Sequence, residues 1–136
     1  MTWIESRMAD LEALRQRNAI IREHAAAIYD ALWGTIVEHL DEAKNKGFAV
    51  STNGALQKRT VKLAKQNLSG DKFQFDLRLV DSKTQISAQG DRVKFMFDLD
   101  VCPDGVVCLK HERQVISVED AAVRVLDPFL FPQLQG

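Results

Sequence analysis

The chain has 136 residues, of which 46% are hydrophobic and 27% charged, and its formal net charge is −1. A chain of this length and composition suits one globular domain rather than two domains or a disordered segment. The near-neutral charge gives the molecule as a whole no preference for an anionic partner, and no apolar run approaches the roughly 20 residues of a membrane-spanning helix. We therefore expect a single domain over residues 1–136 and no membrane partner.

The N-terminus and the cysteine count suggest a location. Residues 1–5 lack the basic segment and following apolar stretch of a secretory signal, so we expect none. Two cysteines, Cys102 and Cys108, are too few for a disulfide framework, and they indicate either a reducing compartment or nothing about the compartment. The sequence therefore predicts a cytoplasmic protein.

A long helix is predicted over the first third of the chain. Thr2 and Glu5 match a capping box, in which each side chain bonds the backbone N–H of the other residue. Gly47 can adopt the left-handed conformation that commonly ends a helix. No proline interrupts the segment between Trp3 and Lys46.

The length of this helix, within residues 1–47, raises a question of packing. At 1.5 Å per residue it would be roughly 66 Å long, whereas a compact domain of this size is about 40 Å across. The helix must therefore either extend beyond the rest of the protein and find another surface, or break near Asn18 and fold back as a hairpin.

The apolar pattern of the helix favours self-association. Apolar residues alternate at spacings of three and four with one polar position, which is typical of a coiled-coil seam. From residue 29 onward, apolar side chains surround most of the helix, which indicates burial by more than one neighbour. We therefore expect a homodimer built through the long helix. Its predicted interface consists of Leu11, Leu14, Asn18, Ile21, Tyr29, Trp33 and Val37, with Phe129 and Phe131 from the C-terminal tail.

After Gly47 the sequence alternates between apolar and polar residues, as half-buried strands do. Turn signals such as Asn53-Gly54, Gly90-Asp91 and Pro103-Asp104-Gly105 separate these strands. We therefore predict an antiparallel β-meander of five to six strands over residues 48–116, curved and packed against the long helix.

Residues 117–136 are predicted to form a short helix and an apolar tail. Ser117 is a good N-cap, and we expect the helix to end at Asp127 because Pro128 follows. The tail either closes the core or docks on another subunit. The predicted fold class is α+β: a long N-terminal helix, a curved antiparallel meander and a short C-terminal helix.

Cys102, Cys108 and His111 lie close together around a predicted hairpin. Three ligands at this spacing, with no fourth, do not match the usual zinc sites. A cross-strand disulfide would need a suitable register and an oxidising compartment. We therefore expect buried thiols, no metal and no other cofactor.

Asp98 and Asp100 would lie on one face of a strand, with Lys94 and Lys110 as neighbours. Two carboxylates so placed could bind a cation or take part in proton transfer, but an exposed ladder of ion pairs is the commoner arrangement. No nucleophile elbow, zinc-protease helix or phosphate-binding loop is present. The sequence therefore assigns no catalytic residue and favours a protein that is not an enzyme.

One segment is locally basic. Residues 44–72 contain seven basic residues and one acidic residue, whereas residues 98–127 contain seven acidic and three basic residues. Few aromatic residues accompany the basic segment to stack on bases, and the two segments could neutralise each other, so nucleic acid is not the expected partner. The residues that could contact the phosphates of a polyanion are Lys58, Arg59, Lys62 and Lys65.

Three functions follow from these patterns. The preferred hypothesis is a non-catalytic protein-interaction or assembly module that forms a homodimer through the long helix. The second is a small apolar-ligand binding protein or enzyme with a pocket between helix and sheet, although the residues that would line it also fit a packed core. The third is polyanion binding through the basic hairpin of residues 44–72. The pocket of the second hypothesis would be lined by Phe73, Phe75, Phe95 and Phe97.

Overall fold

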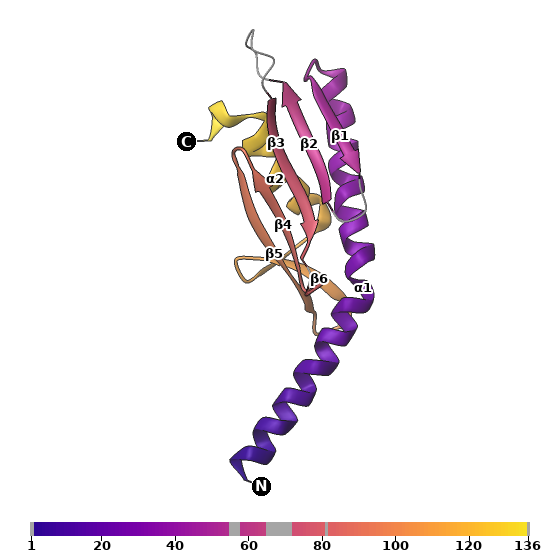
Figure 1. Ribbon diagram of the computed structural model, residues 1–136, viewed down its shortest axis with the longest axis vertical. Coiled ribbons are helices and arrows are strands. Elements are labelled where there is room, and N and C mark those ends of the chain that lie inside the picture. The colour runs from indigo at the N-terminus through magenta and orange to yellow at the C-terminus, as the bar shows by residue number, and fades with distance from the viewer. Residues whose placement is uncertain (1, 55–57, 65–71, 81, 136) are drawn as a thin grey trace.

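The computed structural model of the protein describes residues 2–54, 58–64, 72–80 and 82–135 (Figure 1). Helix α1 (Trp3–Asn45) is continuous over 43 residues, or about 65 Å. The capping box is present: Thr2 Oγ1 accepts from the backbone N–H of Glu5 at 3.2 Å. Gly47 follows the helix with a φ of 103°. The alternative of a break near Asn18 is therefore wrong.

The sheet follows α1 as an antiparallel meander in which each strand pairs with the next strand along the chain. The described ranges contain seven strands, more than the five to six expected, because the segment before the last helix forms an additional short strand. The α+β fold class is confirmed. The strands are β1 (Val50–Gly54), β2 (Lys58–Ala64), β3 (Lys72–Leu79), β4 (Gln85–Gly90), β5 (Val93–Val101), β6 (Val107–His111) and β7 (Gln114–Ile116).

The first predicted hairpin turn is displaced. Asn53 and Gly54 do not turn but continue β1, where they pair with Thr60 and Arg59 of β2. Gly54 lies beside the ring of Trp33, where an added Cβ would make an ordinary van der Waals contact of 3.5 Å with the indole nitrogen. Residues 55–57, which follow β1, lie outside the described residues.

Helix α2 (Val118–Leu130) packs beside α1 on one face of the sheet (Figure 1). Ser117 caps it as predicted, since its hydroxyl accepts from the backbone N–H of Asp120. The predicted end at Asp127 is wrong, because the helix continues through Pro128 to Leu130. The added turn carries Phe129 into the core, where its ring meets the ring of Phe75 edge-on at 4.8 Å. A 3-10 turn, η1 (Pro132–Leu134), follows.

The core lies between the sheet and the second half of α1 together with α2. The largest fully buried side chains come from all three: Phe75, Phe97, Phe129, Ile21, Leu32, Ile36, Leu40, Leu77, Ile86, Val61 and Val125. Tyr29 adds a polar anchor, because its hydroxyl donates to the carbonyl of Leu77 at 2.6 Å. None of the helices in the described part of the chain combines the length and apolar character needed to cross a lipid bilayer.

Candidate functional site

The first turns of α1 stand clear of the rest of the protein (Figure 1). We call residues 3–16 the arm, and the remainder of the described chain the body. Every residue of the arm is exposed, and the first buried residue of α1 is Ile21. The large apolar side chains of the arm and their exposed fractions are Trp3 77%, Ile4 54%, Met8 64%, Leu11 46% and Leu14 48%.

The residues of the predicted interface divide into two groups. Ile21, Tyr29 and Phe129 are at most 3% exposed because the protein's own core covers them. The side chains open to solvent are Leu11, Leu14 and Phe131, while Asn18, Trp33 and Val37 are half-buried. The sheet and α2 thus cover most of the wide apolar circumference of the second half of α1 within the chain.

Sequence reasoning missed the beginning of the exposed stripe. The predicted interface begins at Leu11, because Arg7 stands where the three–four spacing would place the preceding apolar residue. Ile4, Met8 and Leu11 are nevertheless spaced by four and three residues, so they share one face of the helix. That spacing was the signal that could have extended the predicted surface to the start of the helix.

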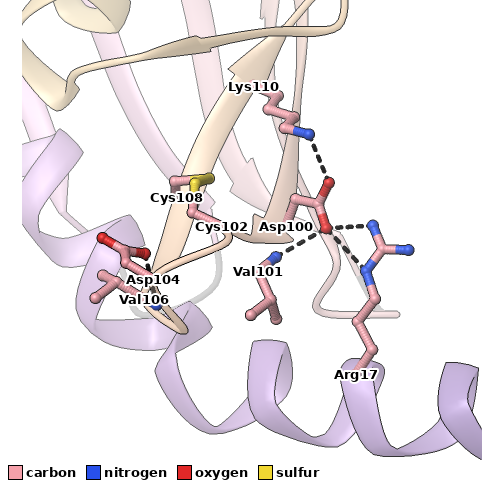
Figure 2. The surroundings of a disulfide bond; sticks show 8 residues. All are labelled: Arg17, Asp100, Val101, Cys102, Asp104, Val106, Cys108 and Lys110. Atoms are coloured by element: carbon pink, nitrogen blue, oxygen red, sulfur yellow. Dashed lines mark hydrogen bonds and ion pairs between the residues drawn. A yellow bond between two sulfur atoms is a disulfide. The ribbon is translucent and has the colours of Figure 1, made fainter.

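Asp100 of β5 fixes α1 at the point where the arm leaves the body (Figure 2). Its Oδ1 accepts from Arg17 Nε at 2.8 Å and also from Arg17 Nη2, while its Oδ2 accepts from Lys110 Nζ at 2.8 Å. The Lys110 hydrogen bond, aided by Arg17, lowers the pKa of Asp100 below its ordinary value and outweighs the opposing effect of burial. The carboxylate is therefore ionised and fully engaged, which suits a structural role.

A cleft of about 410 Å³ opens beside this ion pair, and we call it the charged cleft. Ile21 and Leu99, both nearly buried, form an apolar floor, and ionic side chains surround it. Asp98 accepts from the side-chain amide of Gln85 at 2.9 Å. The cleft thus combines an apolar base with both signs of charge. Its lining consists of Arg17, Asn18, Ile21, Thr84, Gln85, Asp98, Leu99, Asp100, Lys110 and Arg113.

Of the two lysines expected beside Asp98 and Asp100, only Lys110 lies next to them. Asp98 and Lys110 are cross-strand partners in register, and Lys110 bonds Asp100. Lys94 lies opposite Gln89 instead, on the pairing of β4 with β5. No group of three or more metal-binding side chains occurs among the residues that the structure describes.

Cys102 and Cys108 are joined by a disulfide bond, with their Cα atoms 6.3 Å apart (Figure 2). The expectation of buried free thiols is therefore wrong. The register of β5 and β6 sets Cys108 opposite Asp100, and Cys102 lies two residues beyond Asp100 on the same face. The cytoplasmic prediction rested in part on the low cysteine count, and since disulfides persist mainly in oxidising compartments, it loses that part of its support.

His111 does not approach the two sulfur atoms as a third ligand. Its Nδ1 lies 2.8 Å from Arg124 Nη1 of α2, and its ring lies 5.5 Å from the ring of Phe95 and 5.3 Å from that of Phe97. The histidine thus packs between the sheet and α2 on the core side of β6. Its surroundings match a structural residue.

The basic hairpin presents fewer free cations than its sequence suggests. Arg59 turns toward α1, where its Nη2 donates to Asp30 at 2.6 Å and its guanidinium lies 4.5 Å above the ring of Tyr29. Burial raises the pKa of Tyr29, and the Arg59 charge opposes that rise. Lys62 is exposed. The side chain of Lys58, and Lys65 as a whole, lie outside the described residues.

The predicted ligand pocket between helix and sheet is filled by side chains. Phe75 and Phe97 are fully buried, and the rings of Phe95 and Phe97 stack at 6.0 Å. A different opening, of about 430 Å³, lies between α1 and α2, and we call it the apolar groove. Its lining consists of His39, Glu42, Ala43, Lys46, Phe48, Val123, Leu126, Asp127, Leu130 and Phe131.

Comparison with known proteins gives no match: no family model fits the chain, and no curated protein or solved structure is detectably similar to it. The fold and its surfaces define the protein only as an α+β domain with a projecting helix. Function must therefore be argued from the arm, the two openings and their chemistry.

Proposed function

We propose that this protein is a non-catalytic assembly module that forms a homodimer through the exposed arm of α1. The observation that carries the proposal is the stripe of large apolar side chains on a helical segment that no other part of the described chain covers. An isolated helix as short as the arm is marginal in water. A second helix lying on the stripe would remove the apolar side chains from water and stabilise the helical arm.

The size of the effect fits a reversible dimer. Covering the exposed part of each large apolar side chain contributes roughly 1 kcal/mol, so the ten side chains of two arms contribute about 10 kcal/mol. Association itself costs about 4–15 kcal/mol in lost freedom of motion. The two quantities are comparable, and the dimer should therefore form and dissociate with protein concentration.

The charge of the arm favours a second copy as the partner. Residues 3–16 contain three acidic and two basic side chains, so two identical arms meet with little net repulsion. Some of this charge is already balanced within the arm, since Arg7 Nη1 lies 3.5 Å from Asp10 Oδ2. A polyanion or a strongly basic partner would find no complementary surface here.

The proposal is tested by light scattering and sedimentation over a range of protein concentrations. We expect a dimer at tens of micromolar, and we expect Leu11→Glu to weaken it at least about 10-fold because a charge would enter the apolar contact. Ala13→Glu is the matched control, since it adds the same charge to an exposed position of the arm away from the apolar stripe. A monomer throughout, or equal weakening by both variants, would contradict the proposal.

A second candidate function is binding of a small apolar ligand in the apolar groove, whose volume of about 430 Å³ lies within the range typical of ligand sites. Val123 lines the groove and is 48% exposed, and Val115, at 58%, does not line it. Titration with an anilinonaphthalene sulfonate dye should show binding that Val123→Glu removes and Val115→Glu leaves intact. Equal binding by both variants would reject this site.

A further inference from the structure

We infer that the two arms pair antiparallel and that Trp3 of each copy enters the charged cleft of the other. This inference rests on the proposed homodimer and adds its orientation and its contact with the body. The relevant observations are the direction in which the apolar stripe faces, the length of the arm, and the position of the charged cleft.

The stripe and the body lie on the same side of α1. Ile4, Leu11, Ala25 and Leu32 follow one another at multiples of seven residues, so they share one face of the helix. Ala25 and Leu32 are fully buried, with no exposed surface, beneath the body. The face that is exposed in the arm is therefore the face that the body covers further along.

This arrangement excludes a parallel pair in register. The partner helix would run along the stripe toward Arg17, where Asp100 of β5 already bonds α1. The two bodies, both on the stripe side and both at the same end, would collide. In an antiparallel pair the bodies lie at opposite ends of the paired arms, and both stripes are covered.

The length of the arm sets the register. Residues 3–16 extend about 21 Å, and the body begins at Arg17, which bonds Asp100. A register that sets Ile4 of one copy against Leu14 of the other overlaps the two arms almost fully and leaves Trp3 level with Arg15. Helical side chains point toward the N-terminus, so the indole of Trp3 reaches forward to the charged cleft.

The cleft suits an indole ring. Its volume of about 410 Å³ is ample for one aromatic side chain, and its floor of Ile21 and Leu99 is apolar. Arg113 lies in its lining with Arg17, so a guanidinium can stack on the indole face. Asp98 can accept from the indole N–H, which otherwise needs a partner when buried. Trp3, the most exposed apolar residue of the arm at 77%, would thus be covered.

Cysteine cross-linking tests the orientation. Both native cysteines are bonded to each other, so an introduced cysteine supplies the free thiol. An equimolar mixture of Ile4→Cys and Leu14→Cys should give mainly a mixed cross-linked dimer on mild oxidation, and Ile4→Cys alone should give several-fold less. Efficient cross-linking of Ile4→Cys to itself would overturn the antiparallel orientation and leave the homodimer standing. A protein that stays monomeric in light scattering would overturn both.

Fluorescence tests the position of Trp3. In a Trp33→Phe background Trp3 is the sole tryptophan, and its emission should move to shorter wavelength as concentration rises into the dimer range. Trp3→Ala should weaken the dimer about 10-fold, as expected for an aromatic side chain buried in a pocket of the partner, and Trp3→Phe should weaken it less. A dimer in which the emission of Trp3 stays that of a solvated indole would overturn its place in the cleft.

Discussion

The two parts of α1 use one sequence pattern for opposite outcomes. Leu11 and Leu32 occupy equivalent positions three heptads apart, yet Leu11 is 46% exposed and Leu32 is fully buried. The difference comes from what the chain folds against the helix: the sheet and α2 cover the second part and stop at Arg17. An apolar stripe therefore predicts that a helix face will be covered, but does not tell whether the cover belongs to the same chain.

Replacing leucine by alanine in each part of α1 tests the difference between them most strongly. Leu32→Ala should lower the free energy of unfolding by about 3 kcal/mol, because it leaves a cavity in the core. Leu11→Ala should leave that free energy within about 0.5 kcal/mol at concentrations where the protein is monomeric, and should weaken association instead. Urea denaturation and sedimentation measure the two quantities. Equal losses of stability would mean that the arm belongs to the core.

The disulfide belongs to the body, and its removal should act on the body alone. The bond joins residues six positions apart, and a loop of this size gives about 2 kcal/mol by the chain-entropy estimate. Cys102→Ser together with Cys108→Ser should lower unfolding stability by that amount in urea. Dimerisation of the variant, measured under conditions where it remains folded, should be unchanged; a weaker dimer would show that the hairpin also positions the arm.

Asp100→Asn should remove a smaller, pH-dependent contribution to the free energy of unfolding, at the boundary between the arm and the body. At neutral pH we expect a loss of about 1–2 kcal/mol, since the hydrogen bonds to charged donors weaken. The pKa of Asp100 is lowered in the folded protein, so its stabilisation is complete above the unfolded pKa near 4 and is lost as pH falls through the lower folded pKa. The stability difference between wild type and variant should therefore shrink in acid. At neutral pH Asp10→Asn, in the exposed arm, should leave the free energy of unfolding within about 0.5 kcal/mol.

Removing the side-chain hydrogen bonds that cap the two helices should have the smallest effect on stability. Ser117→Ala should lower global stability by about 1 kcal/mol, because α2 is packed in the core. Thr2→Ala removes an equivalent hydrogen bond at the free end of the arm, so it should increase local fraying while the denaturation midpoint of the monomer stays the same. Amide hydrogen exchange of the first turn and urea denaturation distinguish the two results. A shifted midpoint for Thr2→Ala would contradict the independence of the arm.

Local signals in the sequence were sufficient for most of the fold. The capping box at Thr2, the glycine at position 47 and the alternation around Phe75 each act within a few residues, and they predicted the long helix and the meander. The continuation of α2 past Pro128 was not predictable in this way, because it depends on the contact of Phe129 with Phe75 across the core. The prediction of a turn at Asn53-Gly54 failed for a similar reason, since pairing with β2 keeps these residues extended.

The candidate site was predictable only in part. Leu11 and Leu14 were identified from their spacing, whereas the burial of Ile21, Tyr29 and Phe129 depends on how the later strands and α2 pack against α1. The disulfide required the register of β5 against β6, which places Cys102 and Cys108 on one face. The charged cleft brings Arg17 together with residues more than 60 positions away, and no local sequence pattern predicts this contact.

The strictly sequential order of the strands has a consequence for synthesis of the protein. Each strand pairs with its predecessor, so the sheet can grow hairpin by hairpin with short loop closures as the chain leaves the ribosome. The long helix is made first, but Phe129, which closes the core against Phe75, is among the last residues made. Until then the part of the apolar stripe that α2 covers is exposed on the nascent chain. In a polysome, neighbouring nascent chains would therefore meet while this surface is larger than in the finished protein.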